Sequence, residues 1–173
     1  YTLQQIIRHI NEVAPGVPVI ADGKRGDIGN TNRGYIEAVF EYLGADALTL
    51  HPYLGLKDGM QPFIDRKDKG FFVLARTSNA GAKDYQDLFT LPFDPNDRQE
   101  LSAEAMLEKI SKSCLPLYQR IAADIAPRWN VNRNCGVVAG ATFPEELKRI
   151  RSIVGHDVTI LIPAVGEQGG ELE

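Results

Sequence analysis

Residues 20–31 have the sequence IADGKRGDIGNT, in which two acids, two bases and three glycines follow a short apolar run. That run, residues 17–21, is typical of a buried strand entered from a Pro/Gly turn. Because side chains on a strand alternate between its faces, Asp22 and Lys24 are expected on the same face. Asp27 lies three residues further on, in a loop flanked by glycines, so it can reach the same site only by folding back or by entering a neighbouring subunit's site. The stretch therefore predicts a charged site at the end of a strand.

Strands and helices alternate on both sides of this stretch. Strands are expected at 17–21, 46–50, 70–75, 136–140 and 158–162, and helices at 1–13, 31–43, 56–66, 102–125 and 143–154. The polar, Asp-rich residues 82–100 are expected to form a long loop. This alternation predicts an α/β protein with a parallel sheet and helical crossovers.

Two architectures satisfy this alternation, an open doubly wound sheet and a (β/α)8 TIM barrel. No GxGxxG or GxxxxGK[ST] motif follows any of the expected strands, which favours the barrel. A barrel has eight strands, more than this chain supplies. We therefore expect residues 1–173 to form a single barrel domain that covers roughly the third to seventh strands. It would be incomplete at both ends, either truncated or partly ordered.

The composition narrows the class of protein. The chain has 173 residues, 43% of them hydrophobic, which is enough for one domain with a sizeable core. A formal net charge of −4 argues against a general nucleic-acid binder but allows a small anionic substrate. The two cysteines, Cys114 and Cys135, lie outside any metal-ligand spacing, so a reduced intracellular protein is the default. Since the sequence has neither a long apolar run nor a signal-peptide pattern, we expect a cytoplasmic protein without a membrane partner, with organelle targeting left open.

The charged residues of the opening stretch are candidates for catalysis. Asp22, Lys24 and Asp27 are expected at the mouth of the barrel, where one carboxylate presses against a substrate anion while Lys24 donates a proton. Two like charges about 4 Å apart repel by roughly 4 kcal/mol at an effective dielectric constant of 20, and a substrate carboxylate would escape that repulsion by leaving as carbon dioxide. The alternative is a structural salt-bridge cluster. Arg76, after the third expected strand, is expected to be an ion-pair partner or to face solvent.

The pattern Asp-x-Lys-x-x-Asp-Ile at residues 22–28 resembles the signature of the orotidine 5′-phosphate decarboxylase family, in the branch with Lys-Arg-Gly-Asp-Ile-Gly. The resemblance extends from about residue 17 to the Gln-Gly-Gly sequence at 168–170. It implies a carbon–carbon lyase that converts orotidine 5′-phosphate to UMP in de novo pyrimidine synthesis. In such an enzyme Lys24 would protonate C6 of the pyrimidine within an Asp–Lys–Asp network, and neither a cofactor nor a metal would be needed.

The resemblance also implies a homodimer with shared active sites. The residues that match Asp27, Ile28 and Thr31 are contributed across the dimer interface to the partner's site. Thr31 has a second interpretation from the sequence itself, because Asn30-Thr31 ahead of an apolar periodic run is typical of a helix N-cap.

Four further residues are candidate substrate ligands. Ser78 matches a serine that hydrogen-bonds the base, although Ala80 stands where the family usually has proline, and Ser78 is alternatively a turn residue. Pro163 matches a residue that packs on the pyrimidine. Gln168 matches a residue that contacts phosphate and base, and Gly169 belongs to a glycine-rich loop whose N–H groups can approach a phosphate closely.

The residues that hold the ribose and part of the phosphate in this family are expected outside this chain. The resemblance also allows a fusion to an orotate phosphoribosyltransferase. Two other functions stay open. One is a Mg²⁺-dependent sugar-phosphate decarboxylase or synthase of the same suprafamily, which uses a similar strand-end Asp/Lys/Asp set. The other is a non-catalytic nucleotide-binding segment of a larger protein.

Overall fold

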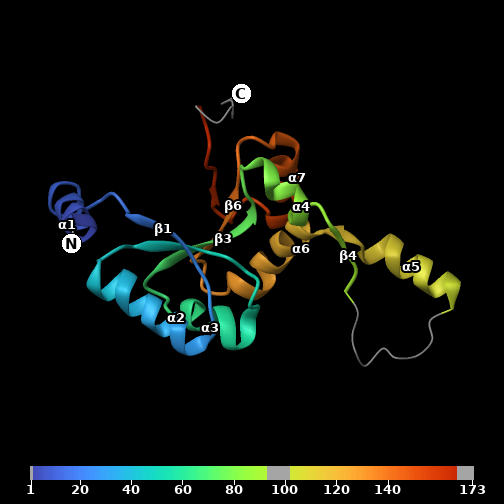
Figure 1. The fold of residues 1–173 in the computed structure, drawn as a ribbon, viewed down its shortest axis with the longest axis horizontal. Helices are drawn as coiled ribbons and strands as arrows, with labels where there is room; N and C mark the ends of the chain where they lie inside the picture. The colour runs from blue at the N-terminus through green and yellow to red at the C-terminus, as the bar shows by residue number, and fades with distance from the viewer. Residues whose placement is uncertain (1, 93–101, 167–173) are drawn as a thin grey trace.

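The computed structural model describes residues 2–92 and 102–166, which are built around a sheet of five parallel strands (Figure 1). The strands are β1 (Ile20–Arg25), β2 (Ala47–Leu50), β3 (Gly70–Arg76), β6 (Cys135–Ala139) and β7 (Ile160–Leu161). They lie side by side in chain order, β1-β2-β3-β6-β7. A doubly wound sheet reverses its strand order at a switch point, whereas a (β/α)8 barrel adds each strand on the same side. The sheet is therefore an arc of a barrel wall, which confirms the predicted architecture.

The position of these strands within a complete barrel, and the extent of the domain, stay predictions. Helices connect consecutive strands, as expected for parallel pairing. They are α2 (Gly29–Ile36), α3 (Gln61–Ile64), α6 (Leu117–Asp124) and α7 (Pro144–Val154), whereas α1 (Thr2–Val13) precedes β1. π-Helical turns follow at Glu37–Tyr42 and Ile125–Trp129, and the turn at Leu56–Met60 is interrupted by non-helical backbone at Lys57 and Asp58. Within residues 2–92 and 102–166, every helix is too short or too polar to cross a bilayer.

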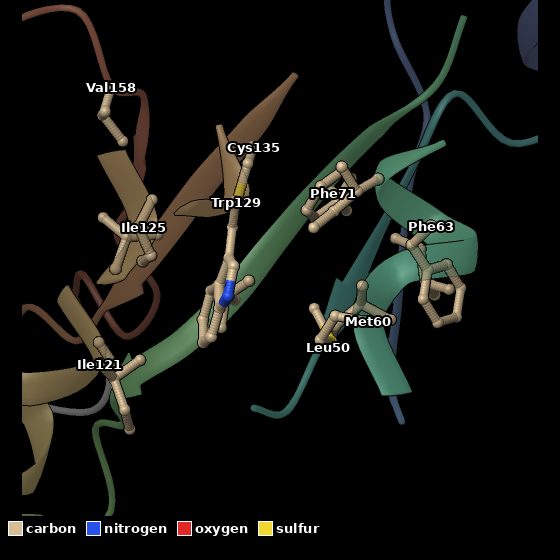
Figure 2. Packing of buried hydrophobic residues seen from close by; sticks show 14 of the residues in the cluster. Leu50, Met60, Phe63, Phe71, Ile121, Ile125, Trp129, Cys135 and Val158 are labelled. Atoms are coloured by element: carbon tan, nitrogen blue, oxygen red, sulfur yellow. The ribbon is translucent and has the colours of Figure 1, made fainter. Parts of the chain in front are cut away.

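The hydrophobic core lies between the sheet and the helices (Figure 2). β2 and β6 are buried at every position, because parallel strands in the middle of such a sheet are covered on both faces. Large apolar side chains from strands and helices meet in one cluster that includes Leu50, Phe63, Phe71, Ile125 and Trp129. Full burial of each such side chain contributes roughly 1.5–3 kcal/mol, so this layer fixes the strands against the helices.

The segment between β3 and β6 differs from the prediction of a long loop and one long helix. It contains a 3₁₀ turn (Ala80–Ala82), α4 (Lys83–Gln86), β4 (Phe89–Thr90), α5 (Ala103–Ser113) and β5 (Leu115–Pro116). β4 and β5 pair antiparallel in a separate small sheet, from which α5 projects (Figure 1). The long helix is interrupted because Pro116 lacks a backbone N–H and its ring obstructs the preceding turn. The chain thus leaves the barrel wall after β3 and returns to it at α6.

The prediction that Thr31 caps a helix is wrong. α2 begins at Gly29 with Ile28 at its N-cap, and Thr31 lies inside the first turn. The fully buried Asn32 organises this turn instead, since its Oδ1 accepts from the N–H of Asp27 at 2.9 Å. Its Nδ2 donates to the carbonyls of Asp27 at 2.5 Å and Gly59 at 2.7 Å. A single amide side chain therefore joins the loop after β1 to the segment that precedes α3.

Candidate active site

Asp22 and Lys24 form an ion pair at the carboxyl end of β1. The Nζ of Lys24 donates to Oδ2 of Asp22 at 2.6 Å, on the exposed face that the alternation of β1 predicts. The side chains remain 53% exposed for Lys24 and 64% for Asp22, and ion pairs this exposed contribute little to stability. A pair at the mouth of a barrel is therefore better explained by chemistry than by folding.

Thr49 of β2 fixes this pair and was not found by the sequence analysis. Its Oγ1 donates to Oδ1 of Asp22 at 2.8 Å and accepts from the backbone N–H of Lys24 at 2.9 Å. The Thr49 side chain is only 1% exposed, so the hydroxyl needs these partners. The sequence feature that could have identified Thr49 is its polar side chain in the otherwise apolar β2. Threonine is too common in strands for this feature to be specific.

An irregularity in the pairing of β1 with β2 orients the Asp22–Lys24 pair. Ala21 pairs with Leu48 and Arg25 with Leu50, so three residues of β1 stand opposite the single Thr49. This bulge rotates the strand at its end, as bulges near active sites commonly do. Lys24 adopts a φ of +44°, an uncommon value for a residue other than glycine. The backbone is thus held in a costly conformation where the ammonium group is presented.

The electrostatics keep Asp22 ionised near neutral pH. The hydrogen bond from Lys24 is the main reason that the pKa of the Asp22 carboxyl lies below its ordinary value. Partial burial opposes this shift, and the hydroxyl of Thr49 adds to it. The site therefore presents a carboxylate and an ammonium group side by side, stabilised by a buried hydroxyl.

A cavity of about 560 Å³ opens beside this pair. Its polar lining comes from the ends of three strands and includes Asp22, Lys24, Thr49, Ser78 and Asn79. Pro163 and Ala164 line it after a fourth strand, β7. Apolar side chains of the barrel interior, Ile20, Leu74, Val138 and Leu161, close its floor. A second cavity of about 710 Å³ lies between α2 and α3, so volume alone does not identify the site. Convergence of the strand ends does, because active sites of barrels lie at that edge.

The structure brings together some of the residues predicted for the site and separates others. Ser78 and Pro163 line the same cavity as Asp22 and Lys24. Asp27 is not among the described residues that line this cavity. The Oδ1 of Asp27 instead accepts from the N–H of the neighbouring Ile28 at 2.7 Å.

Ile28 and Thr31 are also exposed, with Ile28 at 58%. The loop that carries Asp27 thus does not fold back onto the Asp22–Lys24 pair of its own chain. The predicted ligands Gln168 and Gly169 lie outside the described residues.

An all-parallel barrel wall with an acid–lysine pair, a serine loop and a proline around one strand-end cavity defines a TIM-barrel protein with a preformed polar site for a small ligand. The chain belongs to the orotidine 5′-phosphate decarboxylase / HUMPS family, whose sequence model matches residues 2–173.

Relatives and solved structures agree with this assignment. The chain is 45% identical over 171 residues to an orotidine 5′-phosphate decarboxylase of Ralstonia nicotianae and to another of Ralstonia pickettii, covering 99% of this chain and 54% of each relative. It thus spans about half the length of these curated relatives. A Leishmania donovani UMP synthase superposes with a TM-score of 0.78 at 38% identity, over 98% of this chain and 32% of that one. A Leishmania donovani OMP decarboxylase gives 0.73 at 37% identity, over 94% and 54%.

Proposed function

We propose that the protein containing this chain decarboxylates orotidine 5′-phosphate to UMP. The observation that carries the proposal is the Asp22–Lys24 ion pair of 2.6 Å at the edge of the strand-end cavity. The names of the relatives supply the substrate, and the pair supplies groups suited to the reaction. The carboxylate of Asp22 would destabilise the carboxylate of the substrate by repulsion. The ammonium group of Lys24 would supply the proton that takes the place of the departed carboxylate.

Each charge has one task in this mechanism. Asp22 stays ionised, and a substrate carboxylate about 4 Å away is repelled by roughly 4 kcal/mol at an effective dielectric constant of 20. The bond between C6 and the carboxylate breaks, carbon dioxide leaves, and the electron pair remains on C6. The ammonium group of Lys24 then gives a proton to C6, and the partly exposed amine regains one from water. Thr49 holds Asp22 throughout, which is electrostatic preorganisation.

Substrate binding is assigned to the remaining candidates. Ser78 would hydrogen-bond the pyrimidine edge and Pro163 would pack on the ring, since both lie in the cavity with the pair. Gln168 and Gly169 would bind the phosphate. No step of this scheme uses a cofactor or a metal.

A homodimer with shared sites is part of the same proposal. Asp27, Ile28 and Thr31 are outside the cavity of their own chain, and Ile28 exposes a large apolar side chain. In a partner's cavity, Asp27 would complete the charged network, and Ile28 and Thr31 would contact the substrate. A cytoplasmic location and a fusion to an orotate phosphoribosyltransferase also remain proposals. The similarity to a UMP synthase that is about three times as long as the matched part favours the fusion.

The test is release of carbon dioxide from orotidine 5′-phosphate by the intact protein and by Lys24→Ala. Removing the proton donor is expected to lower kcat by about 10³-fold, within the usual range for general acid catalysis. Lys148→Ala is the matched control, because Lys148 forms a similar ion pair of 2.7 Å with Glu145 on α7. Near-normal turnover by Lys24→Ala would show that the assigned proton donor is wrong.

The same assay separates the alternatives. Binding of UMP without any release of carbon dioxide would establish a non-catalytic nucleotide-binding protein. Loss of activity in EDTA, restored by Mg²⁺, would favour the metal-dependent sugar-phosphate branch. We expect activity to survive EDTA.

A further inference from the structure

Arg76 is a buried charge that the proposed mechanism does not use. It ends β3, its side chain is 0% exposed, and its Nη1 lies 2.9 Å from Oδ1 of Asp87. Its Nη2 lies 3.7 Å from Oε1 of Glu146 on α7, and its Cζ lies 4.1 Å from the ring centre of Phe143. Taking a guanidinium out of water costs free energy that its ion pairs often fail to offset, and the carboxylates of Asp87 and Glu146 stay 40% and 25% exposed. Stability alone therefore does not explain an arginine here.

The residue after Arg76 is tied to the same helix end. The N–H of Thr77 donates to Oε1 of Gln86 at 2.9 Å, and Nε2 of Gln86 donates back to Oγ1 of Thr77 at 2.8 Å. Arg76 and Thr77 thus pair with Asp87 and Gln86, two consecutive residues at the end of α4. The hydroxyl of Thr77 also donates to Oδ1 of Asn79 at 2.8 Å, which carries the connection to the cavity lining.

The segment after β6 holds Ser78 from the other side. Oγ1 of Thr142 donates to the carbonyl of Ser78 at 2.9 Å, and the N–H of Gly140 donates to the carbonyl of Arg76 at 2.9 Å. A Cβ on Gly140 would lie 2.8 Å from Cα of Ser78, so only glycine lets the two segments meet this closely. Glu146, the second acid beside Arg76, lies on the helix that follows this segment. The guanidinium therefore joins both supports of the Ser78 loop.

We propose that Arg76 is a positioning residue that, through Asp87 and Glu146, sets the place of Ser78 in the cavity. The inference rests on the proposed function, because it requires that Ser78 binds the base of the nucleotide. Arg76 itself stays behind the lining of the cavity and acts only through the loop that follows it. Its effect is expected on recognition of the base and not on the Asp22–Lys24 pair, which lies on another strand, β1.

The experiment measures binding of two probes to the intact protein by calorimetry. UMP carries a base, whereas ribose 5-phosphate lacks one. Asp87→Asn keeps an acceptor for Arg76 but removes the charge that fixes it. This variant is expected to raise the Kd of UMP about tenfold, the size of one hydrogen bond made poorly, and to leave the Kd of ribose 5-phosphate unchanged. Gln86→Ala, which removes the neighbouring connection, is expected to act in the same direction and serves if Asp87→Asn does not fold.

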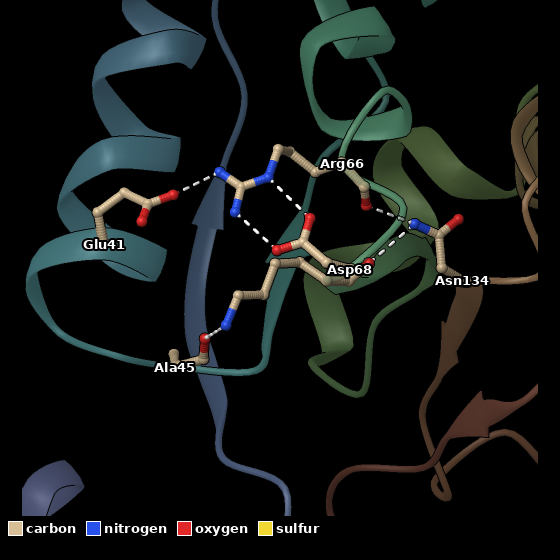
Figure 3. Close-up of polar contacts among 6 residues, drawn as sticks. Glu41, Ala45, Arg66, Asp68 and Asn134 are labelled. Atoms are coloured by element: carbon tan, nitrogen blue, oxygen red, sulfur yellow. Dashed lines mark hydrogen bonds and ion pairs between the residues drawn. The ribbon is translucent and has the colours of Figure 1, made fainter.

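A double-mutant cycle tests whether the effect passes through Ser78. In a Ser78→Ala background, Asp87→Asn is expected to cause no further loss of UMP affinity, since the group that it positions is gone. Arg66→Lys is the control, because Arg66 also binds two carboxylates, those of Glu41 and Asp68, near the start of β3 (Figure 3). Its Kd for UMP should equal that of the wild type.

The outcomes distinguish this inference from the proposed function. If the wild type releases carbon dioxide and binds UMP while Asp87→Asn and Ser78→Ala act additively, the positioning role is wrong and the function stands. Equal losses of affinity for both probes would likewise overturn the positioning role, because they would indicate a general structural effect. If the wild type neither binds UMP nor turns over orotidine 5′-phosphate, the function is wrong and the inference falls with it.

Discussion

Near the amino end of β3, Arg66 binds Asp68 through two nitrogens at 2.9 Å each and Glu41 at 2.6 Å, at the protein surface. At the carboxyl end of the same strand, the fully buried Arg76 pairs with two partly exposed carboxylates, those of Asp87 and Glu146. The amide of Asn134 completes the first network by donating to the carbonyls of Arg66 and Lys69 (Figure 3).

The two ends differ in whether their polar groups remain available to bind a ligand. At the amino end, the polar groups pair with one another and with the backbone carbonyls of residues 66 and 69, so the network closes a turn. At the carboxyl end, the network around the buried Arg76 supports a loop, and Asp22, Lys24 and Ser78 line a cavity. Barrels commonly divide stability and function in this way between their two ends. The predictions below test that division, from the largest effect to the smallest.

Neutralising one acid at each end should affect activity very differently. Asp22→Asn removes the charge beside Lys24 and is expected to lower kcat/KM by about 10²–10³-fold, a typical loss for one preorganised electrostatic group. Asp68→Asn removes a carboxylate from the Arg66 network and should leave kcat/KM unchanged. Steady-state assays of both variants measure the contrast. Equal activities would show that the carboxyl end has no special role.

Substitution of alanine for Gly136, near the amino end of β6, and for Gly140, just after its carboxyl end, tests how tight packing at each end affects stability and binding. At Gly136 a Cβ would lie 2.5 Å from the ring of Phe72 and 2.7 Å from the carbonyl of Thr159, and at Gly140 it would meet Ser78. Both substitutions should lower the free energy of unfolding by about 1–3 kcal/mol, as overpacking does. Only Gly140→Ala should also weaken UMP binding. Urea denaturation and calorimetry separate the two effects, and a matching loss of UMP affinity in Gly136→Ala would contradict the division.

Asn134→Ala isolates the amino-end network. The change removes the donor for two backbone carbonyls and is expected to lower the free energy of unfolding by about 1–3 kcal/mol. Values of kcat and KM should stay at those of the wild type where the protein is folded. Urea denaturation measured beside the activity assay checks this, and a large change in KM would mean that the two ends are coupled.

Acid titration should show the smallest effect. Arg66 lowers the pKa of the Asp68 carboxyl to about 2, and Lys24 lowers that of Asp22. Since both folded pKa values lie below the ordinary value of about 3.9, these pairs stabilise the protein above that pH and lose the contribution as the pH falls through the folded values. The change in stability should be slight, because Asp22 and Asp68 are largely exposed. Carboxyl NMR titrations measure the shifts, and a midpoint near 3.9 for Asp68 would contradict the network.

The sequence predicted the barrel and most of its strands because periodicity and alternation are local signals. It also placed Asp22 and Lys24 on one face, since that follows from two-residue spacing. The bulge opposite Thr49 depends on the pairing of two strands, which no local pattern encodes. Asn32 replaced the expected Thr31 cap because its partners include Gly59, which is distant in sequence.

Arg76 shows the same limit. The sequence predicted an ion-pair partner or an exposed side chain, and the ion pair is confirmed. Its complete burial depends on Asp87, which lies between β3 and β6, and on Phe143 and Glu146, which follow β6. The sequence predicts a loop at 82–92 because α4 and β4 are each very short, and β4 forms only by pairing with β5, which is distant in sequence.

The pairing of β3 with β6 also has a consequence for the order of folding. The pairings of β1 with β2 and of β2 with β3 join segments that are close in the chain. Phe71 of β3, in contrast, pairs with Cys135 of β6, which is distant in sequence. Contacts between distant segments carry a larger loop-closure entropy and form more slowly. The cavity is lined from both sides of the β3–β6 pairing. Asp22 and Lys24 belong to the strands that pair first, and Val138 and Pro163 belong to the part that joins the sheet later. Competence to bind a ligand should therefore be the last property that the refolding chain acquires.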